Sequence, residues 1–208
     1  MSSTPLEQAA AALARGEVVA VPTDTVYGLA VDPRLPGGPG RVFALKKRPE
    51  SFPLPVLIAD PAEVDELAET TPAANRLICS YWPGALTLVL VRRGGLGLDL
   101  GGDPTTIGLR CPAHGLLRQL LQDTGPLAVT SANHHGEPPL HTAEAVRSRF
   151  GSGVTKVLDG GRCDGLPSTV VSLVSSEPLC LREGALGFAE LAAVAAGDDP
   201  RPSAGAAS

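Results

Sequence analysis

The stretch PTDTVYGL, Pro22–Leu29, carries the most information in this chain. It follows the short apolar run Val18–Val21, which predicts a buried strand. Two threonines, an aspartate and a tyrosine then fall within Thr23–Tyr27. Open α/β sheets bind their ligands where strands end, so these groups indicate a site. The alternative is a hydroxyl or Asx turn that only caps the strand. We favour the site, because such a turn seldom needs a tyrosine.

Composition bounds the fold and its partners. The chain has 208 residues, of which 43% are hydrophobic and only 3% aromatic, so the core must consist of Val, Leu and Ala. The 24 glycines and 20 prolines indicate many turns and helix ends. A net charge of −5 excludes a basic field over the whole surface, of the kind that binds nucleic acid, but allows a local basic cleft.

The cysteines and the N-terminal segment predict a cytoplasmic protein. The cysteines are Cys79, Cys111, Cys163 and Cys180. They form no C-x-x-C pair, so we expect four buried thiols in a reducing compartment. The N-terminus lacks the basic and apolar regions of a signal peptide, and no apolar run could span a membrane. We therefore expect a soluble chain without membrane contact.

Strand and helix patterns alternate along the whole chain. Apolar runs predict strands at 17–22, 54–59, 85–91, 106–110, 127–130, 154–158, 169–174 and 179–182. The capping box Thr4-Pro5-Leu6-Glu7 predicts a first helix that stops at Gly16. Further helices are predicted over 41–47, 115–122, 143–150 and 188–195, with helix starts at Asp60 and Thr71. This order predicts one α/β domain over 1–196, built as a twisted mixed sheet with flanking helices. Two hairpin-like strand pairs are expected late in the chain, and 197–208 reads as a disordered tail.

Cations and hydroxyls follow several of these elements. Lys46 and Arg48 stand at a predicted helix end and suit phosphate, although a solvated helix end is the alternative. Ser131 and Asn133 follow an apolar strand, where an Asx turn is equally compatible. Other candidates are the strand-terminal arginines Arg110 and Arg182, each of which either reaches solvent or meets an anion, and Ser168 at a strand start.

Several established site motifs are missing from the sequence. Neither nucleotide-binding glycine loop is present, nor the G-x-S-x-G of hydrolases. The histidines His134, His135 and His141 lack ligand spacing, so we expect no protein-bound metal. A site rich in cations and hydroxyls but poor in nucleophiles works by positioning and charge neutralisation. Nucleotidyl transfer fits this description.

Seven segments in order resemble one family. They are PTDTVYGL, the K-x-R pair with PLPVLI, WPGALTLVL, IGLRCPAH, the S-x-N pair, LPSTVV and LREG. They resemble the YrdC-like family, the threonylcarbamoyl-AMP synthases, in the single-domain type, and the resemblance covers roughly Gly16–Gly184. The resemblance implies an α/β sheet with a concave basic cleft.

The resemblance also implies a reaction and its partners. L-threonine and bicarbonate form N-carboxythreonine, which attacks the α-phosphate of ATP to give L-threonylcarbamoyladenylate and pyrophosphate. ATP is then a substrate, and Mg²⁺ is expected with it. The product passes to a separate tRNA threonylcarbamoyl transferase machinery. A contact between this chain and tRNA stays open.

Position by position, the resemblance implies roles for particular residues. The expected L-threonine contacts are Thr25, Arg110, Ser131 and Ser168. The expected ATP contacts are Arg48, Phe52, Thr106, Asn133, His141 and Arg182. The expected catalytic set is Lys46, Arg48, Ser131 and Asn133. One departure concerns a histidine that touches threonine in some members, because Leu57 takes that position here.

Two other readings compete with this function. An RNA-binding module could use the same basic cleft without chemistry, although the acidic balance and the few aromatics count against it. A paralogue could instead form a carbamoyl-adenylate or another acyl-adenylate with the same motifs.

Overall fold

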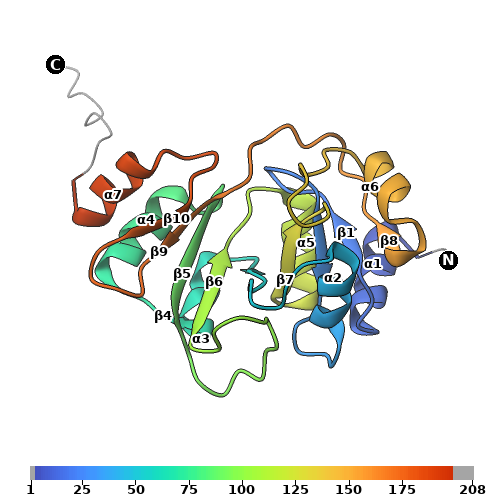
Figure 1. The fold of residues 1–208 in the computed structure, drawn as a ribbon, viewed down its shortest axis with the longest axis horizontal. Helices are drawn as coiled ribbons and strands as arrows, with labels where there is room; N and C mark the ends of the chain where they lie inside the picture. Colours follow the sequence, from blue (N-terminus) through green and yellow to red (C-terminus); the bar gives the residue numbers. More distant parts are fainter. Residues whose placement is uncertain (1–2, 199–208) are drawn as a thin grey trace.

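The computed structural model describes residues 3–198, which form one mixed ten-stranded sheet with helices on its faces (Figure 1). The strands follow the order β10-β9-β5-β6-β3-β7-β2-β1-β8, and β4 pairs with β5. Parallel and antiparallel pairs alternate irregularly, as predicted from the mixture of elements in the sequence. None of the helices in residues 3–198 has the length and apolarity that a bilayer-spanning segment requires.

The bounds of the elements are as follows. The strands are β1 (Val19–Val21), β2 (Gly28–Val31), β3 (Val56–Leu57), β4 (Ala68–Glu69), β5 (Leu86–Arg92), β6 (Thr106–Arg110), β7 (Leu127–Ser131), β8 (Lys156–Val157), β9 (Thr169–Ser172) and β10 (Leu179–Arg182). The α-helices are α1 (Pro5–Ala14), α2 (Gly38–Lys46), α3 (Val64–Leu67), α4 (Pro72–Tyr81), α5 (Gly115–Thr124), α6 (Ala143–Phe150) and α7 (Phe188–Ala196). Two short 3₁₀ turns cover Pro61–Glu63 and Gly151–Gly153.

The sheet consists of two wings that meet at β3. We call β10, β9, β5, β6 and β4 the β5 wing, and β7, β2, β1 and β8 the β7 wing. In Figure 1 the β5 wing lies with α3, α4 and α7, and the β7 wing with α1, α2, α5 and α6. Val56 and Leu57 pair in parallel with β6 and antiparallel with β7. Two residues of β3 therefore carry the ladder from one wing to the other.

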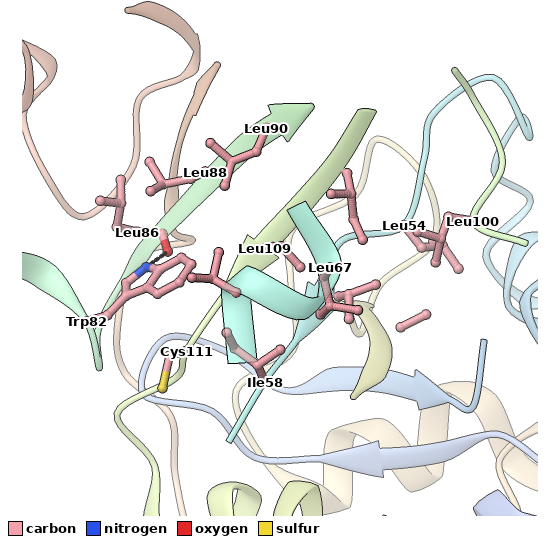
Figure 2. Close-up of a cluster of buried hydrophobic side chains, with 14 of the residues drawn as sticks. Leu54, Ile58, Leu67, Trp82, Leu86, Leu88, Leu90, Leu100, Leu109 and Cys111 are labelled. Atoms are coloured by element: carbon pink, nitrogen blue, oxygen red, sulfur yellow. Dashed lines mark hydrogen bonds between the residues drawn. The ribbon is translucent and has the colours of Figure 1, made fainter. Parts of the chain in front are cut away.

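Only one face of the β5 wing is covered by helices. Leu86, Leu88 and Leu90 of β5 point into the core together with Leu109 of β6. Figure 2 shows these side chains beside Trp82, whose indole Nε1 donates to the Leu86 carbonyl at 2.8 Å. Apolar residues of α3, α4 and α7 complete this cluster. Alternate residues point to opposite faces of a strand, so every second residue of β5 faces away from these helices.

The β7 wing is covered on both faces. Side chains from α1 and α5, such as Leu13 and Leu120, pack on the face that carries Val19. The opposite face carries Leu29 and packs in the other cluster with α2 and α6, for example with Val42. A strand buried on both faces reads as a continuous apolar run, which explains the unbroken VVAV and LAV segments.

Several helix predictions are confirmed at their caps. Thr4 and Glu7 form the predicted capping box of α1. Thr71 caps α4 through a hydrogen bond from the Ala74 amide. The predicted start of α2 at residue 41 is wrong, because the helix begins three residues earlier, at Gly38.

Some strand predictions need correction. No strand was predicted at 28–31, but Gly28, within PTDTVYGL, opens β2. The predicted strand 54–59 contains only β3, and prolines at 53 and 55 lack the N–H groups that a longer ladder would need. Of the predicted strand 154–158, only Lys156 and Val157 form a strand, β8, and it pairs in parallel with β1. Within residues 3–198, only one of the two expected late hairpins is therefore present, β9–β10.

The expectation of four buried thiols is also wrong. Cys111 and Cys163 are buried, whereas Cys79 is exposed on α4 and Cys180 is half-buried in β10. All four are free thiols. The predicted disordered tail, 197–208, lies outside the described residues except for its first two positions, of which Gly197 ends α7.

The close approach of β2 and β7 yields a first prediction. A Cβ atom added to Gly28 would lie 2.6 Å from Cγ1 of Val129. We therefore expect Gly28→Ala to lower the free energy of unfolding by about 1–3 kcal/mol in urea denaturation. Gly40 lies in α2 with no atom within 4 Å of such a Cβ, so Gly40→Ala should raise it by about 0.5–1 kcal/mol. Shifts of the same sign in both variants would contradict this packing.

Candidate active site

A pocket of about 350 Å³ lies over the junction of the two wings. The β5 wing contributes Thr87, Thr106, Gly108, Arg110, Ser168 and Arg182 to its lining. The β7 wing contributes Thr23, Thr25, Val129 and Ser131, and the segment around β3 contributes Arg48, Phe52 and Leu57. The pocket therefore joins residues that are far apart in the sequence.

The pocket floor is the uncovered face of the β5 wing. In β6, Thr106, Gly108 and Arg110 alternate with the core residues Ile107 and Leu109. We predicted the site at strand carboxyl ends. Neighbouring strands here often run in opposite directions, so their carboxyl ends do not lie along the same edge of the sheet. The residues meet because they share one open face of the sheet.

The PTDT loop combines a turn with a binding surface. The Thr23 hydroxyl accepts from the Val26 amide at 3.1 Å and donates to the Val26 carbonyl, so it forms the hydroxyl turn that was the alternative reading. Tyr27 is fully buried, and its hydroxyl donates to the Gly161 carbonyl at 2.8 Å. Thr25 lines the pocket and accepts from Nη1 of Arg110 at 3.2 Å.

Arg110 is buried at the pocket wall and is held by two segments of the chain. Its Nη2 lies 2.7 Å from Oδ1 of Asp24, and its Nε donates to the Gly84 carbonyl at 2.9 Å. Burial lowers the pKa of Arg110, and the charge of Asp24 opposes that shift. The sequence left open whether Arg110 reaches solvent or meets an anion. Its side chain is only 7% exposed, so it does not reach solvent.

Two further guanidinium groups border the pocket, and neither has a carboxylate partner within residues 3–198. Arg48 donates to the Phe52 and Pro53 carbonyls, and Arg182 donates to the Ser168 carbonyl at 2.8 Å. Burial lowers the pKa of Arg48, and the positive charge of Arg182 lowers it further. Among the described residues, no aspartate or glutamate lines the pocket. These two arginines therefore leave uncompensated positive charge in it.

Lys46 is directed away from the pocket. Its Nζ donates to the Ser131 carbonyl at 2.5 Å, to the Asn133 carbonyl at 2.6 Å and to Oδ1 of Asn133 at 3.1 Å. An ammonium group has three N–H donors, so these oxygens engage all of them. Burial, and then the charge of Arg48, lower the pKa of Lys46 to about 7.

Asn133 is also engaged within the polypeptide. Its Oδ1 accepts from the Ser131 hydroxyl at 2.5 Å, and its Nδ2 donates to the His134 and Glu137 carbonyls. Lys46 and Asn133 together fix the turn that carries Ser131 to the pocket edge. The helix α2 ends directly after Lys46, where Lys47 has a φ of 52°, and this sharp end lets Lys46 and Arg48 diverge.

Most of the predicted site residues share the pocket. Its lining includes Thr25, Arg48, Phe52, Thr106, Arg110, Ser131, Ser168 and Arg182. It does not include Lys46, Asn133 or His141. His141 instead makes a 2.5 Å hydrogen bond through Nδ1 to the Cys163 carbonyl. Leu57 lies in the pocket opposite Arg110 in the sheet register.

Sequence reasoning missed Thr87 and Gly108 on the pocket floor. Thr87 is buried, and its hydroxyl lies 2.9 Å from that of Ser168. Gly108 has no side chain, so the floor stays open between Pro55 and Thr87. The sequence does carry a signal for both residues. In TIGLR and LTLV the leucines alternate with other residues, which places Gly108 and Thr87 on the face of the sheet opposite the leucines.

Comparisons with known proteins agree with this arrangement. The Sua5/YciO/YrdC family model, described as "Telomere recombination", matches residues 11–184. A putative threonylcarbamoyl-AMP synthase of Mycobacterium tuberculosis is 37% identical over 188 residues, which cover 89% of this chain and 87% of that protein. The threonylcarbamoyl-AMP synthase of Bacillus subtilis is 36% identical and covers 91% of this chain, which spans 56% of it.

Solved structures share the fold. The structure of Pyrococcus abyssi Sua5 in complex with L-threonine has a TM-score of 0.82 and 33% identity. The match covers 93% of this chain and 58% of that one. The E. coli YciO structure has a TM-score of 0.81 over 90% of this chain and 93% of its own, at 24% identity, which supports the fold alone.

The buried amine yields a prediction about pH. The pKa of Lys46 lies near 7 in the folded chain and near 10.5 in an exposed lysine, so between these values only the unfolded chain keeps the proton. The wild type should therefore gain stability relative to Lys46→Met as the pH rises through this window, by at most about 1.4 kcal/mol per pH unit.

Urea denaturation at several pH values measures this difference. Lys47→Met is the matched control, because that neighbour is exposed. If the difference in free energy of unfolding between the wild type and Lys46→Met stays constant from about pH 7 to 10.5, the three oxygens keep the amine protonated.

Proposed function

Because the chain belongs to the Sua5/YciO/YrdC family, we propose that it is an L-threonylcarbamoyladenylate synthase and, in reaction class, a nucleotidyltransferase. One observation of the structure carries the proposal. Three guanidinium groups from separate elements border one pocket, and in the part of the chain that the structure describes only that of Arg110 is paired with a carboxylate. Such a pocket suits a small carboxylate beside a polyphosphate.

The amino acid would occupy the half of the pocket around Arg110. Thr25, Ser131 and Ser168 supply hydroxyls there, and Arg110 supplies a planar cation for the carboxylate. Leu57 and Val129 give this half an apolar wall that suits a methyl group. The Pyrococcus abyssi relative has been solved with L-threonine, which supports the same substrate here.

ATP would occupy the half around Arg48 and Arg182, with Phe52 and Thr106 at its border. Phe52 is half-exposed and stacks loosely with Arg48, whose guanidinium carbon lies 5.6 Å from the ring centre. We propose that Arg48 contacts the phosphates directly. Lys46 and Asn133 would act one step further away, because they hold the turn that carries Ser131.

The proposed reaction has two steps. The amine of threonine adds to bicarbonate with loss of water and gives a carbamate. A carboxylate oxygen of the carbamate then forms a bond to the α-phosphorus, while the bond to the bridging oxygen breaks and pyrophosphate leaves with that electron pair. The uncompensated arginines would stabilise the charge on the departing phosphates. No side chain of the pocket needs to act as a nucleophile.

Mg²⁺ would enter with the nucleotide. Within residues 3–198, no three His, Cys, Asp or Glu side chains gather closely enough to hold a metal ion, and the pocket lining contains no carboxylate. Mg²⁺ commonly binds through substrate phosphates and water, so the proposal requires no carboxylate of the protein to hold it.

The RNA-binding alternative gains no support from the pocket. Single strands bind in open grooves with several stacking aromatics. Here the cations converge on a pocket of about 350 Å³, a size typical of small-molecule sites. Phe52 is the one exposed aromatic at its border among the described residues.

The proposed reaction predicts its own dependencies. Pyrophosphate release should require L-threonine, bicarbonate, ATP and a divalent ion together, because the attacking group is the carbamate and not a side chain. A coupled phosphate assay in bicarbonate-depleted buffer, with mass identification of the adenylate, measures this. Equal release without bicarbonate would exclude the carbamate step.

The two halves of the pocket should respond to different substitutions. Arg48→Ala should weaken ATP binding by about tenfold or more with little effect on threonine, and Thr25→Ala should do the reverse, since a hydrogen bond to a charged group contributes about 1.5–3 kcal/mol. Calorimetric titration of each variant with each ligand measures the four affinities. Equal losses for both ligands would contradict the assignment.

A further inference from the structure

We infer that Asp24 is a positioning residue that divides the pocket into two anion subsites. It neutralises Arg110 and reserves that guanidinium for a carboxylate, and so leaves Arg48 and Arg182 as the place for polyphosphate. This inference rests on the proposed function and deepens it, because it names the residue that keeps the two substrates apart.

Asp24 acts from behind the pocket wall. Its Oδ1 lies 2.7 Å from Nη2 of Arg110 and also accepts from the Ala113 amide at 3.1 Å. Its side chain is 15% exposed and does not belong to the pocket lining. One carboxylate oxygen thus fixes both the guanidinium and the chain that follows β6.

The contacts of Arg110 leave donors for a ligand. A guanidinium has five N–H groups. Three of them are engaged, by Asp24, by the Thr25 hydroxyl and by the Gly84 carbonyl. Within the described residues, two N–H groups remain on a side chain that lines the pocket. A carboxylate can accept two such bonds side by side.

The charge on Asp24 decides which anion can use those donors. The pair of Arg110 and Asp24 has no net charge, so it attracts a polyphosphate weakly, and Asp24 repels the second and third charges of that ligand. A zwitterionic amino acid brings one carboxylate and no net charge, so the repulsion is small. Within residues 3–198, the hydrogen bonds of Arg48 and Arg182 go only to neutral oxygens, from carbonyls and the Ser168 hydroxyl, so these arginines keep their full charge for phosphates.

Asp24→Asn tests this division, because an amide keeps the shape and the acceptor oxygen but removes the charge. In the wild type, inorganic tripolyphosphate should bind equally well to the free and to the threonine-saturated chain. In Asp24→Asn, L-threonine should bind about tenfold or more weakly. Tripolyphosphate should then compete with threonine, while the affinity for ATP changes less than about threefold. Calorimetric titrations measure each of these values.

Asp32→Asn is the matched control. Asp32 is buried and, like Asp24, pairs with an arginine, Arg34, at 2.7 Å, but neither Asp32 nor Arg34 lines the pocket. This variant should leave all three affinities unchanged. A merely structural role of Asp24 would lower stability without creating competition between tripolyphosphate and threonine.

Three results would overturn the inference. The first is unchanged affinity of Asp24→Asn for threonine, and the second is an equal loss of affinity for threonine and ATP in that variant. If the variant does not fold, the third is competition between tripolyphosphate and threonine in the wild type. Failure of the proposed function looks different, because the wild type would then bind no threonine and release no pyrophosphate in its presence.

Discussion

The ion pair between Arg110 and Asp24 joins the two wings of this sheet. Arg110 ends β6 in the β5 wing, and Asp24 belongs to the loop that connects β1 and β2 in the β7 wing. The backbone ladder between the wings passes through the two residues of β3. Removal of one partner from a buried pair leaves an uncompensated charge and costs about 3–5 kcal/mol. The pair therefore bridges the wings beside the β3 ladder and the hydrophobic cluster that both wings share.

The unequal cover of the wings explains where the pocket forms. The β7 wing is buried on both faces, so it gives a rigid support for the PTDT loop and the Ser131 turn. The β5 wing has helices on one face only, and its other face is free to present Thr87, Gly108 and Arg110. Rigid elements hold reacting groups more reliably than loops do, and most of the floor is strand.

Local sequence signals predicted much of this site. The apolar runs located most strands, and the clustered hydroxyls and cations located Thr25, Arg48 and Ser131. Sequence alone could not show that Lys46 turns inward, because that depends on carbonyl groups of a turn 85 residues away. The alternation in TIGLR places Gly108 on the face opposite the leucines, but it does not show that the helices leave that face open. The roles of single residues toward threonine and ATP remain predictions.

The thin junction at β3 affects how genetic data on this chain should be interpreted. Leu57 belongs both to the ladder that joins the wings and to the wall of the pocket. Arg110 likewise belongs to the ladder, to the buried ion pair and to the site. A loss-of-function allele at either position can therefore arise from misfolding or from lost chemistry, and the phenotype of the two is the same. Protein abundance has to be measured beside growth before such an allele is assigned to catalysis.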